Sequence, residues 1–390
     1  TMDLSHGAPA QERGAWKARL DLMIPVIKGW MTEVGQEVTS VGVQIHGGMG
    51  YVEETGAAQF FRDVRITSIY EGTNGIQAAV LVGRKLARDG GATMELVHDE
   101  IRQVADALAG SSDDRLAAIT EAGMHGISFS AYTEGQKPGD ELTSSQIEHR
   151  MAILEPRFNW IRSFSTTEGN ELIPASAKKH GLKTLVGAWL GSDIDKNRIE
   201  INNLITLAHQ GLVDIAAVGN EVLYRREMSE ADLLITMAEV RERLPSNVPM
   251  GYVDAYYEFE DRPAVTEACD VLLTNCYPYW EGCALPYSTL YMQDMYRRVQ
   301  KVAKGKRVII TETGWPSAGG TFYGAEASLQ GSYLYFLKAQ EWAISEGIEL
   351  FYFSSFDEAW KVTGDDGEGD VGAHWGLWDM HEKFKYAPKL

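Results

Sequence analysis

Eight short runs of apolar residues recur through most of the chain, and a stretch with helical periodicity follows nearly every one. The runs are rich in β-branched and aromatic residues, which favour β-strands. They occupy residues 125–132, 158–166, 183–190, 213–221, 249–256, 270–278, 307–315 and 349–360. Successive runs begin 21 to 42 residues apart, about the length of one strand with its crossover helix. This alternation restricts the chain to folds built around a parallel sheet.

Eight strand–helix repeats over roughly 265 residues match the size and order of a (β/α)8 TIM barrel. One of the helices has clear boundary signals, because Ser229 and Asp232 make a capping-box-like start and Pro245 ends it. A doubly wound open sheet is the alternative, but no glycine-rich phosphate loop follows the first run. We therefore predict an α/β fold with a (β/α)8 barrel.

Two glutamates stand at the carboxyl ends of such runs. Glu312 follows four β-favouring residues, 308–311, and precedes a Gly-Trp-Pro turn, while Glu221 ends another apolar run. They are 91 residues apart, which divides into three repeats of about thirty residues. All strands of a parallel barrel end at one rim, where barrel enzymes hold their active sites, so we expect the two carboxylates to converge there. For Glu312 alone, an exposed glutamate at a strand end is the alternative.

The composition disfavours some partners. The net charge is −19, so neither nucleic acid nor an anionic membrane surface is expected to bind. No apolar run reaches the roughly 18 residues that a membrane span needs. The first residues, TMDLSHGAPAQERG, contain no apolar core of a signal peptide. We expect either a cytoplasmic protein or a chain whose true N-terminus is missing.

Three cysteines follow one another at an even spacing of seven residues: Cys269, Cys276 and Cys283. Such a spacing suggests a metal site, but no histidine lies among them. We interpret them as buried or incidental thiols, with one disulfide between Cys276 and Cys283 as the alternative. We expect neither a metal site nor a cofactor.

The first 110 residues differ from the rest. Residues 16–37 and 77–88 carry apolar side chains at helical spacing, and Pro25 would kink the first of these helices or start a new turn. Residues 109–114 (AGSSDD) are small and polar, as in a linker. We expect a partial all-α segment, a linker and a barrel domain, at residues 1–110, 111–118 and 119–390.

The barrel region contains seven motifs in order. They are GISFSAYTEGQKPG (126–139), IRSFST (161–166), VGNEV (218–222), NCYPYWEG (275–282), VIITETGWPSAG (308–319), SSFDEAWK (354–361) and GAHWGLWD (372–379). With these motifs, residues 125–387 resemble family 17 glycoside hydrolases in their bacterial form. That family contains endo-β-1,3-glucanases and β-1,3-glucanosyltransferases. The resemblance implies a retaining enzyme that acts on β-1,3-glucan or laminari-oligosaccharides.

The resemblance also implies two catalytic residues. By motif position Glu221 is the general acid that protonates the departing glycosidic oxygen, and Glu312 is the nucleophile that forms a glycosyl-enzyme. In a retaining enzyme the two carboxyl groups should stand about 5 Å apart. For both to act at one pH, burial and a negative neighbour must keep Glu221 protonated, while hydrogen-bond donors keep Glu312 ionised.

Polar residues around the nucleophile are implied as well. By family position Asn220 should hold the sugar 2-hydroxyl and the nucleophile, and Tyr277 should donate its phenol towards Glu312. Arg162 ends an apolar run and needs a carboxylate partner if it is buried; Glu312 or another rim acid is the natural choice.

Further residues could contact the sugar rings and their hydroxyls. Tyr132 and Trp315 are candidates for stacking on pyranose rings. Two more tryptophans are equally well explained as core residues: Trp280 and Trp360. Glu358 and Lys361 match a Glu and a Lys of the family that lie three residues apart, which implies anchors for sugar hydroxyls. The alternative for this pair is a surface ion pair.

The first segment carries other motifs. They are QIHGGMGY (44–51), FFRDVRITSIYEGTNGIQ (60–77) and LVGRKLARDGG (81–91), and they resemble the C-terminal part of acyl-CoA dehydrogenases. The resemblance implies that Glu71 is the base that removes an α-proton from an acyl thioester; the alternative is a helix-capping or solvated glutamate. In that family two further domains enclose the flavin, and neither is present in this sequence. We expect no activity from this segment alone.

Three hypotheses about function follow. The first is a retaining glycosidase or transglycosylase acting on β-1,3-glucan. The second is a non-catalytic glucan-binding barrel, which the intact Glu221 and Glu312 argue against. The third is a flavin-dependent dehydrogenase fragment that carries the barrel as a passenger. The glycosidase family usually meets polysaccharide outside the cytoplasm, so the resemblance implies an extracytoplasmic location, although no export signal is visible.

Overall fold

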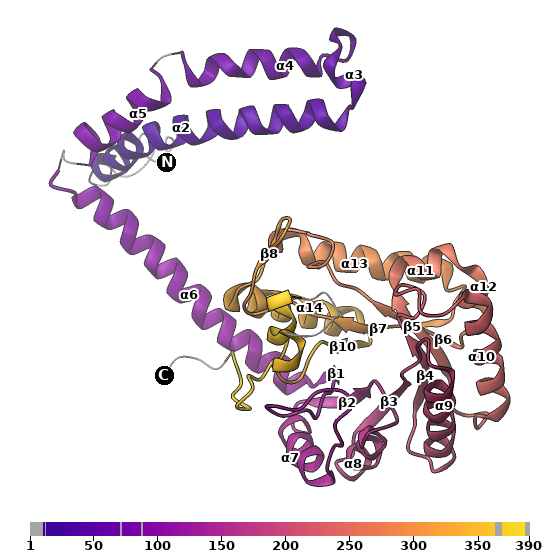
Figure 1. Cartoon of the computed structure of the whole chain (residues 1–390). Helices are drawn as coiled ribbons and strands as arrows, with labels where there is room; N and C mark the ends of the chain where they lie inside the picture. Colours follow the sequence, from indigo (N-terminus) through magenta and orange to yellow (C-terminus); the bar gives the residue numbers. More distant parts are fainter. Residues whose placement is uncertain (1–10, 12, 71, 87–88, 363–368, 387–390) are drawn as a thin grey trace. The chain divides into compact units, whose positions relative to one another are not determined.

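The computed structural model of the chain divides into two units, residues 1–111 and residues 112–390. The structure describes residues 11, 13–70, 72–86, 89–362 and 369–386. Figure 1 shows helices alone in the first unit and a ring of strands surrounded by helices in the second. None of the helices in these ranges combines the length and the apolar character that a membrane span requires.

The first unit is built on one long helix. Helix α2 continues through Pro25 without a break and contacts both α4 and α5. Thr73 caps α5, because its hydroxyl oxygen accepts a hydrogen bond from the amide of Ile76. The helices are α2 (Arg13–Ile45), α3 (Gly48–Tyr51), α4 (Ala57–Val64), α5 (Asn74–Val80) and α6 (Ala92–Ala122). The predicted all-α segment is confirmed.

The residues that we expected to form a linker are helical. Helix α6 includes residues 111–118, and the division between the two units falls within it. Strong helix formers surround the short polar run, with alanine and leucine at most positions of 105–109 and 116–118. Helical propensity therefore outweighs the small polar residues.

The second unit is a closed barrel of eight parallel strands. They are β1 (Met124–Ser128), β2 (Phe158–Ser163), β3 (Lys183–Ala188), β4 (Ile215–Asn220), β5 (Met250–Ala255), β6 (Val271–Asn275), β7 (Arg307–Thr313) and β10 (Leu350–Tyr352). Each strand pairs with the next, and β10 returns to β1 with Gly126 opposite Phe351. A Cβ atom at Gly126 would lie 2.5 Å from that phenyl ring, so the closure needs a glycine. The predicted (β/α)8 barrel is confirmed.

Helices follow the strands around the barrel (Figure 1). They are α7 (Ser144–Leu154), α8 (Ile173–Lys179), α9 (Ile194–His209), α10 (Glu230–Arg243), α11 (Tyr256–Asp261), α12 (Pro263–Ala268), α13 (Leu285–Val302) and α14 (Leu329–Glu346). Helix α10 starts as predicted, with the Ser229 hydroxyl accepting from the amide of Asp232. A short hairpin of β8 (Thr321–Phe322) and β9 (Ala325–Glu326) follows β7.

Apolar side chains of the strands form a cluster of their own, separate from the core under the helices. It consists of Trp160, Leu185, Ile215, Ala217, Val253, Val271, Leu273, Ile309 and Phe351. Alternate residues of a strand share a face, so the residue two positions after each member of this cluster lies on the same inner face of its strand. On three strands the next residue is polar and buried: Arg162 on β2, Asn275 on β6 and Thr311 on β7. The apolar filling therefore ends in a polar layer near the carboxyl ends of the strands.

Candidate active site

Both predicted glutamates lie at the carboxyl end of the barrel. Glu312 is the last residue but one of β7, and Glu221 directly follows β4. The strand pairing is irregular beside each of them. The pairing of β4 with β5 shifts register between Ala217 and Asn220, and the pairing of β6 with β7 shifts between Thr274 and Asn275. A β-bulge changes the direction of the side chains beyond it. Alternation from Ile309 does not place Glu312 on the inner face of β7, and the register shift beside it accounts for its contact with Arg162.

Glu312 is buried and held by two donors. Its Oε1 accepts a hydrogen bond of 2.6 Å from Nη1 of Arg162, and its Oε2 accepts one of 2.6 Å from the Tyr277 hydroxyl. Only 6% of Glu312 is exposed, so the carboxylate has little contact with water. A guanidinium and a phenol at hydrogen-bonding distance stabilise its negative charge.

Arg162 also holds Asn220 in place. Its Nη2 donates 2.7 Å to the side-chain oxygen of Asn220, and its Nη1 donates 3.1 Å to the carbonyl oxygen of Thr311. Arg162 therefore connects Asn220 to Glu312, and no direct hydrogen bond between these two is found in the described part of the chain. The amide nitrogen of Asn220 stays available for a ligand in this arrangement.

Glu221 has a different environment. Nδ2 of Asn275 donates 2.8 Å to its Oε1, and the Thr311 hydroxyl donates 2.9 Å to the side-chain oxygen of Asn275, which fixes the orientation of that amide. Desolvation is the largest cause that raises the pKa of Glu221, to about 7, and the negative charge of Glu312 is the next. One carboxyl group is thus shifted towards the protonated form, while its neighbour is surrounded by donors.

Sequence reasoning missed Asn275. It lies two residues beyond Leu273 of the apolar cluster, so strand alternation places it on the inner face. An asparagine there cannot be left unsatisfied, and both of its side-chain partners belong to the site. A polar residue two positions after a buried apolar residue of the same strand is the sequence pattern that could have indicated Asn275.

The pair Glu358 and Lys361 is buried. Lys361 Nζ lies 3.1 Å from Glu358 Oε2, and the side chains of Lys361 and Glu358 are 9% and 7% exposed. Lys361 also lies 4.5 Å from the ring centre of Phe353. The alternative of a surface ion pair is therefore wrong. A buried pair holds its geometry better than an exposed one, as anchors for hydroxyl groups require.

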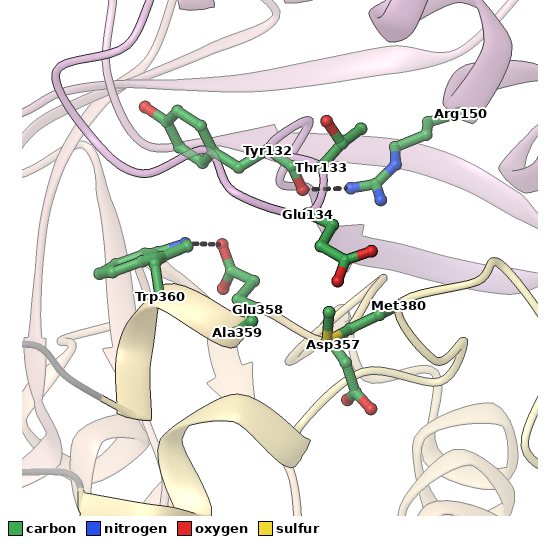
Figure 2. Close-up of a pocket in the computed structure, with 9 residues that line it drawn as sticks. All are labelled: Tyr132, Thr133, Glu134, Arg150, Asp357, Glu358, Ala359, Trp360 and Met380. Carbon is green, nitrogen blue, oxygen red and sulfur yellow. Dashed lines mark hydrogen bonds between the residues drawn. The ribbon is translucent and has the colours of Figure 1, made fainter.

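A small pocket lies between the loops that follow β1 and β10. Figure 2 shows Tyr132 and Glu134 on one side of it and Glu358 and Trp360 on the other. The Trp360 indole N–H donates 3.2 Å to Glu358 Oε1, and the rings of Tyr132 and Trp360 meet edge to face at 6.3 Å. The remaining residues that line it are Thr133, Arg150, Asp357, Ala359 and Met380. The pocket brings two of the predicted contact residues, Tyr132 and Glu358, together with Trp360.

Trp315 is not placed to stack on a sugar. It is completely buried, its indole N–H donates 2.9 Å to the carbonyl oxygen of Glu326, and its ring packs on Tyr279 and Tyr335. A ring with no exposed face cannot receive a ligand, so the prediction for Trp315 is wrong.

Trp280 belongs to the same aromatic region but is only partly buried. Its ring packs against those of Tyr279, Phe322 and Trp375. These contacts agree with the interpretation of Trp280 as a core residue.

No group of three or more His, Cys, Asp or Glu side chains in the described part of the chain could hold a metal ion. Cys269, Cys276 and Cys283 are all free, so the alternative of a disulfide is wrong. Glu71, the residue matched to the dehydrogenase base, lies outside the described residues.

Substituting Arg162 with methionine should lower the free energy of unfolding by about 3 to 5 kcal/mol, because the buried Glu312 would lose its cationic partner. Urea denaturation of the two proteins measures this. Arg297→Met is a matched control, since its pair with Glu346 is exposed and should contribute less than about 1 kcal/mol. Equal costs for Arg162→Met and Arg297→Met would contradict a stabilising role of Arg162 towards Glu312.

Glu221→Gln should stabilise the protein relative to the wild type, and this gain should be larger above pH 7 than below pH 4.5. A folded pKa of about 7 against an ordinary value of 4.5 means that the wild type loses stability as the pH rises through this window. Glutamine does not titrate, so its advantage should grow to about 3 kcal/mol and then stay constant. Urea denaturation at several pH values measures it. A difference that does not change with pH would contradict the raised pKa.

The barrel matches a known family model. Residues 126–376 match the model described as the BtgE/BtgC glycoside hydrolase domain. Nearer the N-terminus, positions 6–86 match the model for the C-terminal domain of acyl-CoA dehydrogenases. The two resemblances read from the motifs are thereby confirmed.

Individual relatives agree with this division. The chain is 43% identical over 150 residues to 3-methylmercaptopropionyl-CoA dehydrogenase of Ruegeria pomeroyi, covering 37% of this chain but only 26% of that protein. It is 28% identical over 291 residues to a glucan 1,3-beta-glucosidase of Arthroderma benhamiae, covering 69% of this chain and 92% of the relative. The chain thus spans about a quarter of the dehydrogenase and nearly all of the glucosidase.

A solved structure has a similar barrel. It is an active-site mutant of the beta-1,3-glucanosyltransferase of Rhizomucor miehei in complex with laminaritriose. The TM-score is 0.61 at 28% identity, and the match covers 68% of this chain and 96% of that one.

Proposed function

The chain belongs to the BtgE/BtgC glycoside hydrolase family, and from this premise we propose that it cleaves β-1,3-glucan by a retaining, double-displacement mechanism. The observation that carries the proposal is the contrast between its two rim glutamates. Glu312 has an arginine and a tyrosine as donors, while the pKa of Glu221 is raised to about 7. One group suited to attack and one suited to donate a proton are what a retaining glycosidase needs.

In the first step Glu312 attacks the anomeric carbon of the sugar. The glycosidic bond breaks as Glu221 gives its proton to the departing oxygen, and the sugar becomes esterified to Glu312. Before the attack, Arg162 and Tyr277 hold both oxygens of Glu312 in a fixed orientation. The attack leaves Glu221 ionised, so it is ready to act as a base.

In the second step Glu221 removes a proton from the acceptor, which attacks the anomeric carbon and releases Glu312. The charge of Glu312 is one of the causes that raise the pKa of Glu221. Esterification removes that charge, so the pKa of Glu221 should fall in the intermediate, when a base is required. The same residue can therefore act as acid and then as base.

The proposed substrate is a β-1,3-linked glucan. The names of two relatives support it, since one is a glucan 1,3-beta-glucosidase and the other is in complex with laminaritriose. Within the site, the buried pair of Glu358 and Lys361 and the amide of Asn220 offer hydrogen bonds to sugar hydroxyls. Tyr132 and Trp360 offer aromatic faces in the adjoining pocket. We propose residues 119–390 as the catalytic domain.

Transfer to another sugar is a second candidate activity. The glycosyl-enzyme is common to hydrolysis and transglycosylation, and the similar solved structure is a glucanosyltransferase. Incubation with laminarihexaose separates the two, because hydrolysis yields shorter products and transfer also yields longer ones. Proton NMR of the first products should show the β-anomer. Unchanged substrate would contradict both activities and favour a glucan-binding barrel.

The dehydrogenase alternative concerns the first unit. A bound flavin would absorb visible light, so the spectrum of the purified chain tests it directly. We propose that this unit has no dehydrogenase activity by itself, because the match covers only the C-terminal domain of that family. Flavin absorbance in the purified protein would overturn this.

A further inference from the structure

The backbone at Glu221 has an unusual conformation. Its φ is +55°, in the left-handed region that residues other than glycine seldom adopt, and Gly219, two residues earlier, also has a positive φ of 86°. Such a conformation costs free energy and persists only where the surroundings hold it. The residues that hold this segment therefore determine where the Glu221 carboxyl group lies.

Strand β5 supplies these contacts. The Glu221 amide donates 2.8 Å to the carbonyl oxygen of Val253. The amide of Leu223 donates 3.0 Å to the Tyr252 hydroxyl oxygen, and the amide of Tyr224 donates 3.4 Å to Oδ2 of Asp254. Within residues 221–224, three backbone amides are thus bound by three consecutive residues of β5.

Tyr252 and Asp254 act as one unit. They lie two positions apart on β5, so their side chains share a face of the strand, and the Tyr252 hydroxyl donates a hydrogen bond to Asp254 Oδ2. The amide of Ala255 donates 2.7 Å to the other oxygen, Oδ1. Both side chains are fully buried. Neither has a part in the reaction steps described above, yet a buried carboxylate is costly to keep.

We propose that Tyr252 and Asp254 are positioning residues, which hold the Glu221 segment so that its carboxyl group faces the glycosidic oxygen. This inference rests on the proposed function. The two residues bind the segment through its amides, and Asp254 adds a negative charge close to Glu221.

The charges around Glu221 fit this role. Glu312 and Asp254 both raise the pKa of Glu221, while the amide of Asn275 and the charge of Arg225 lower it. Asp254 itself has a raised pKa of about 6, caused first by burial; the hydrogen bond from Tyr252 opposes the rise, and Glu258 adds to it. Above about pH 6 Asp254 is therefore negatively charged, in the range where Glu221 must still hold its proton.

The first test is Tyr252→Phe, which removes both the acceptor of the Leu223 amide and the hydroxyl that donates to Asp254. We expect kcat on laminari-oligosaccharides to fall at least tenfold, with KM changing less than twofold. On an aryl β-glycoside with a good leaving group, which needs no acid, the rate of glycosyl-enzyme formation should fall less than threefold. Tyr296→Phe, a buried tyrosine on α13, is the matched control and should change the rate on neither substrate.

The second test is Asp254→Asn, which keeps the shape and removes the charge. The alkaline limb of the kcat/KM profile should move to lower pH, because Glu221 would lose its proton more easily. Asp214→Asn, at the opposite end of the barrel next to Thr184, should leave the profile unchanged. Circular dichroism checks that all variants are folded.

A purely structural role would give a different result. Equal losses on both substrates with Tyr252→Phe and an unmoved pH profile with Asp254→Asn, in a wild type that cleaves laminari-oligosaccharides, would overturn the inference alone. A wild type inactive on both substrates would overturn the proposed function and the inference together.

Discussion

Replacing Glu312 with glutamine is expected to reduce kcat on laminari-oligosaccharides by at least about 10⁴-fold, because no other group can form the glycosyl-enzyme. Glutamine keeps an acceptor for Arg162 and a partner for Tyr277, so binding should change little. Initial rates and KM measured by product chromatography test this. Alanine at the same position should be equally inactive but less stable, since it removes the side-chain acceptor that glutamine still offers to the buried Arg162.

A matched control lies nearby in the chain. Glu326 is exposed in strand β9 and lies outside the proposed site, so Glu326→Gln should retain full activity. Circular dichroism and urea denaturation show whether Glu312→Gln is folded. A folded Glu312→Gln protein with more than about 1% of wild-type activity would mean that another group is the nucleophile.

Replacing Glu221 with alanine should give losses that depend on the leaving group. On laminari-oligosaccharides the rate should fall by about 10² to 10⁴-fold, the usual contribution of a general acid. An aryl β-glycoside with a good leaving group should still form the intermediate, which then accumulates because no base activates water. Steady-state and burst kinetics with both substrates measure this difference.

Azide makes this prediction sharper. A small anionic nucleophile needs no base, so sodium azide should restore turnover of the aryl glycoside by Glu221→Ala and yield a β-glycosyl azide. The same addition should do nothing for Glu312→Gln, which forms no intermediate. Equal losses on both substrates, with no effect of azide, would contradict the acid and base role of Glu221.

The fold could be predicted from the sequence because its signal is repeated. Each buried strand of a parallel barrel needs an apolar run, and eight such runs at crossover spacing leave few alternatives. The positions of Glu221 and Glu312 at the ends of two runs placed them on one rim without any coordinates.

Details set by packing between distant segments could not be predicted. Trp315 lies three residues after Glu312 in the chain, yet the β8–β9 segment and two tyrosines enclose it completely. The burial of Glu358 and Lys361 depends likewise on neighbours such as Phe353. The register shift beside Glu312 leaves no local pattern in the sequence. The helical residues 111–118 were missed because a short polar run was given more weight than its flanks.

The most direct test of the central claim is to trap the glycosyl-enzyme. A 2-deoxy-2-fluoro laminaribiosyl fluoride should inactivate the protein with time, because the fluorine slows the second step more than it slows the first. Intact-mass spectrometry should then show one added disaccharide, and peptide mapping should place it on Glu312. A label on any other residue, or none in a protein that cleaves laminari-oligosaccharides, would contradict the two-glutamate mechanism.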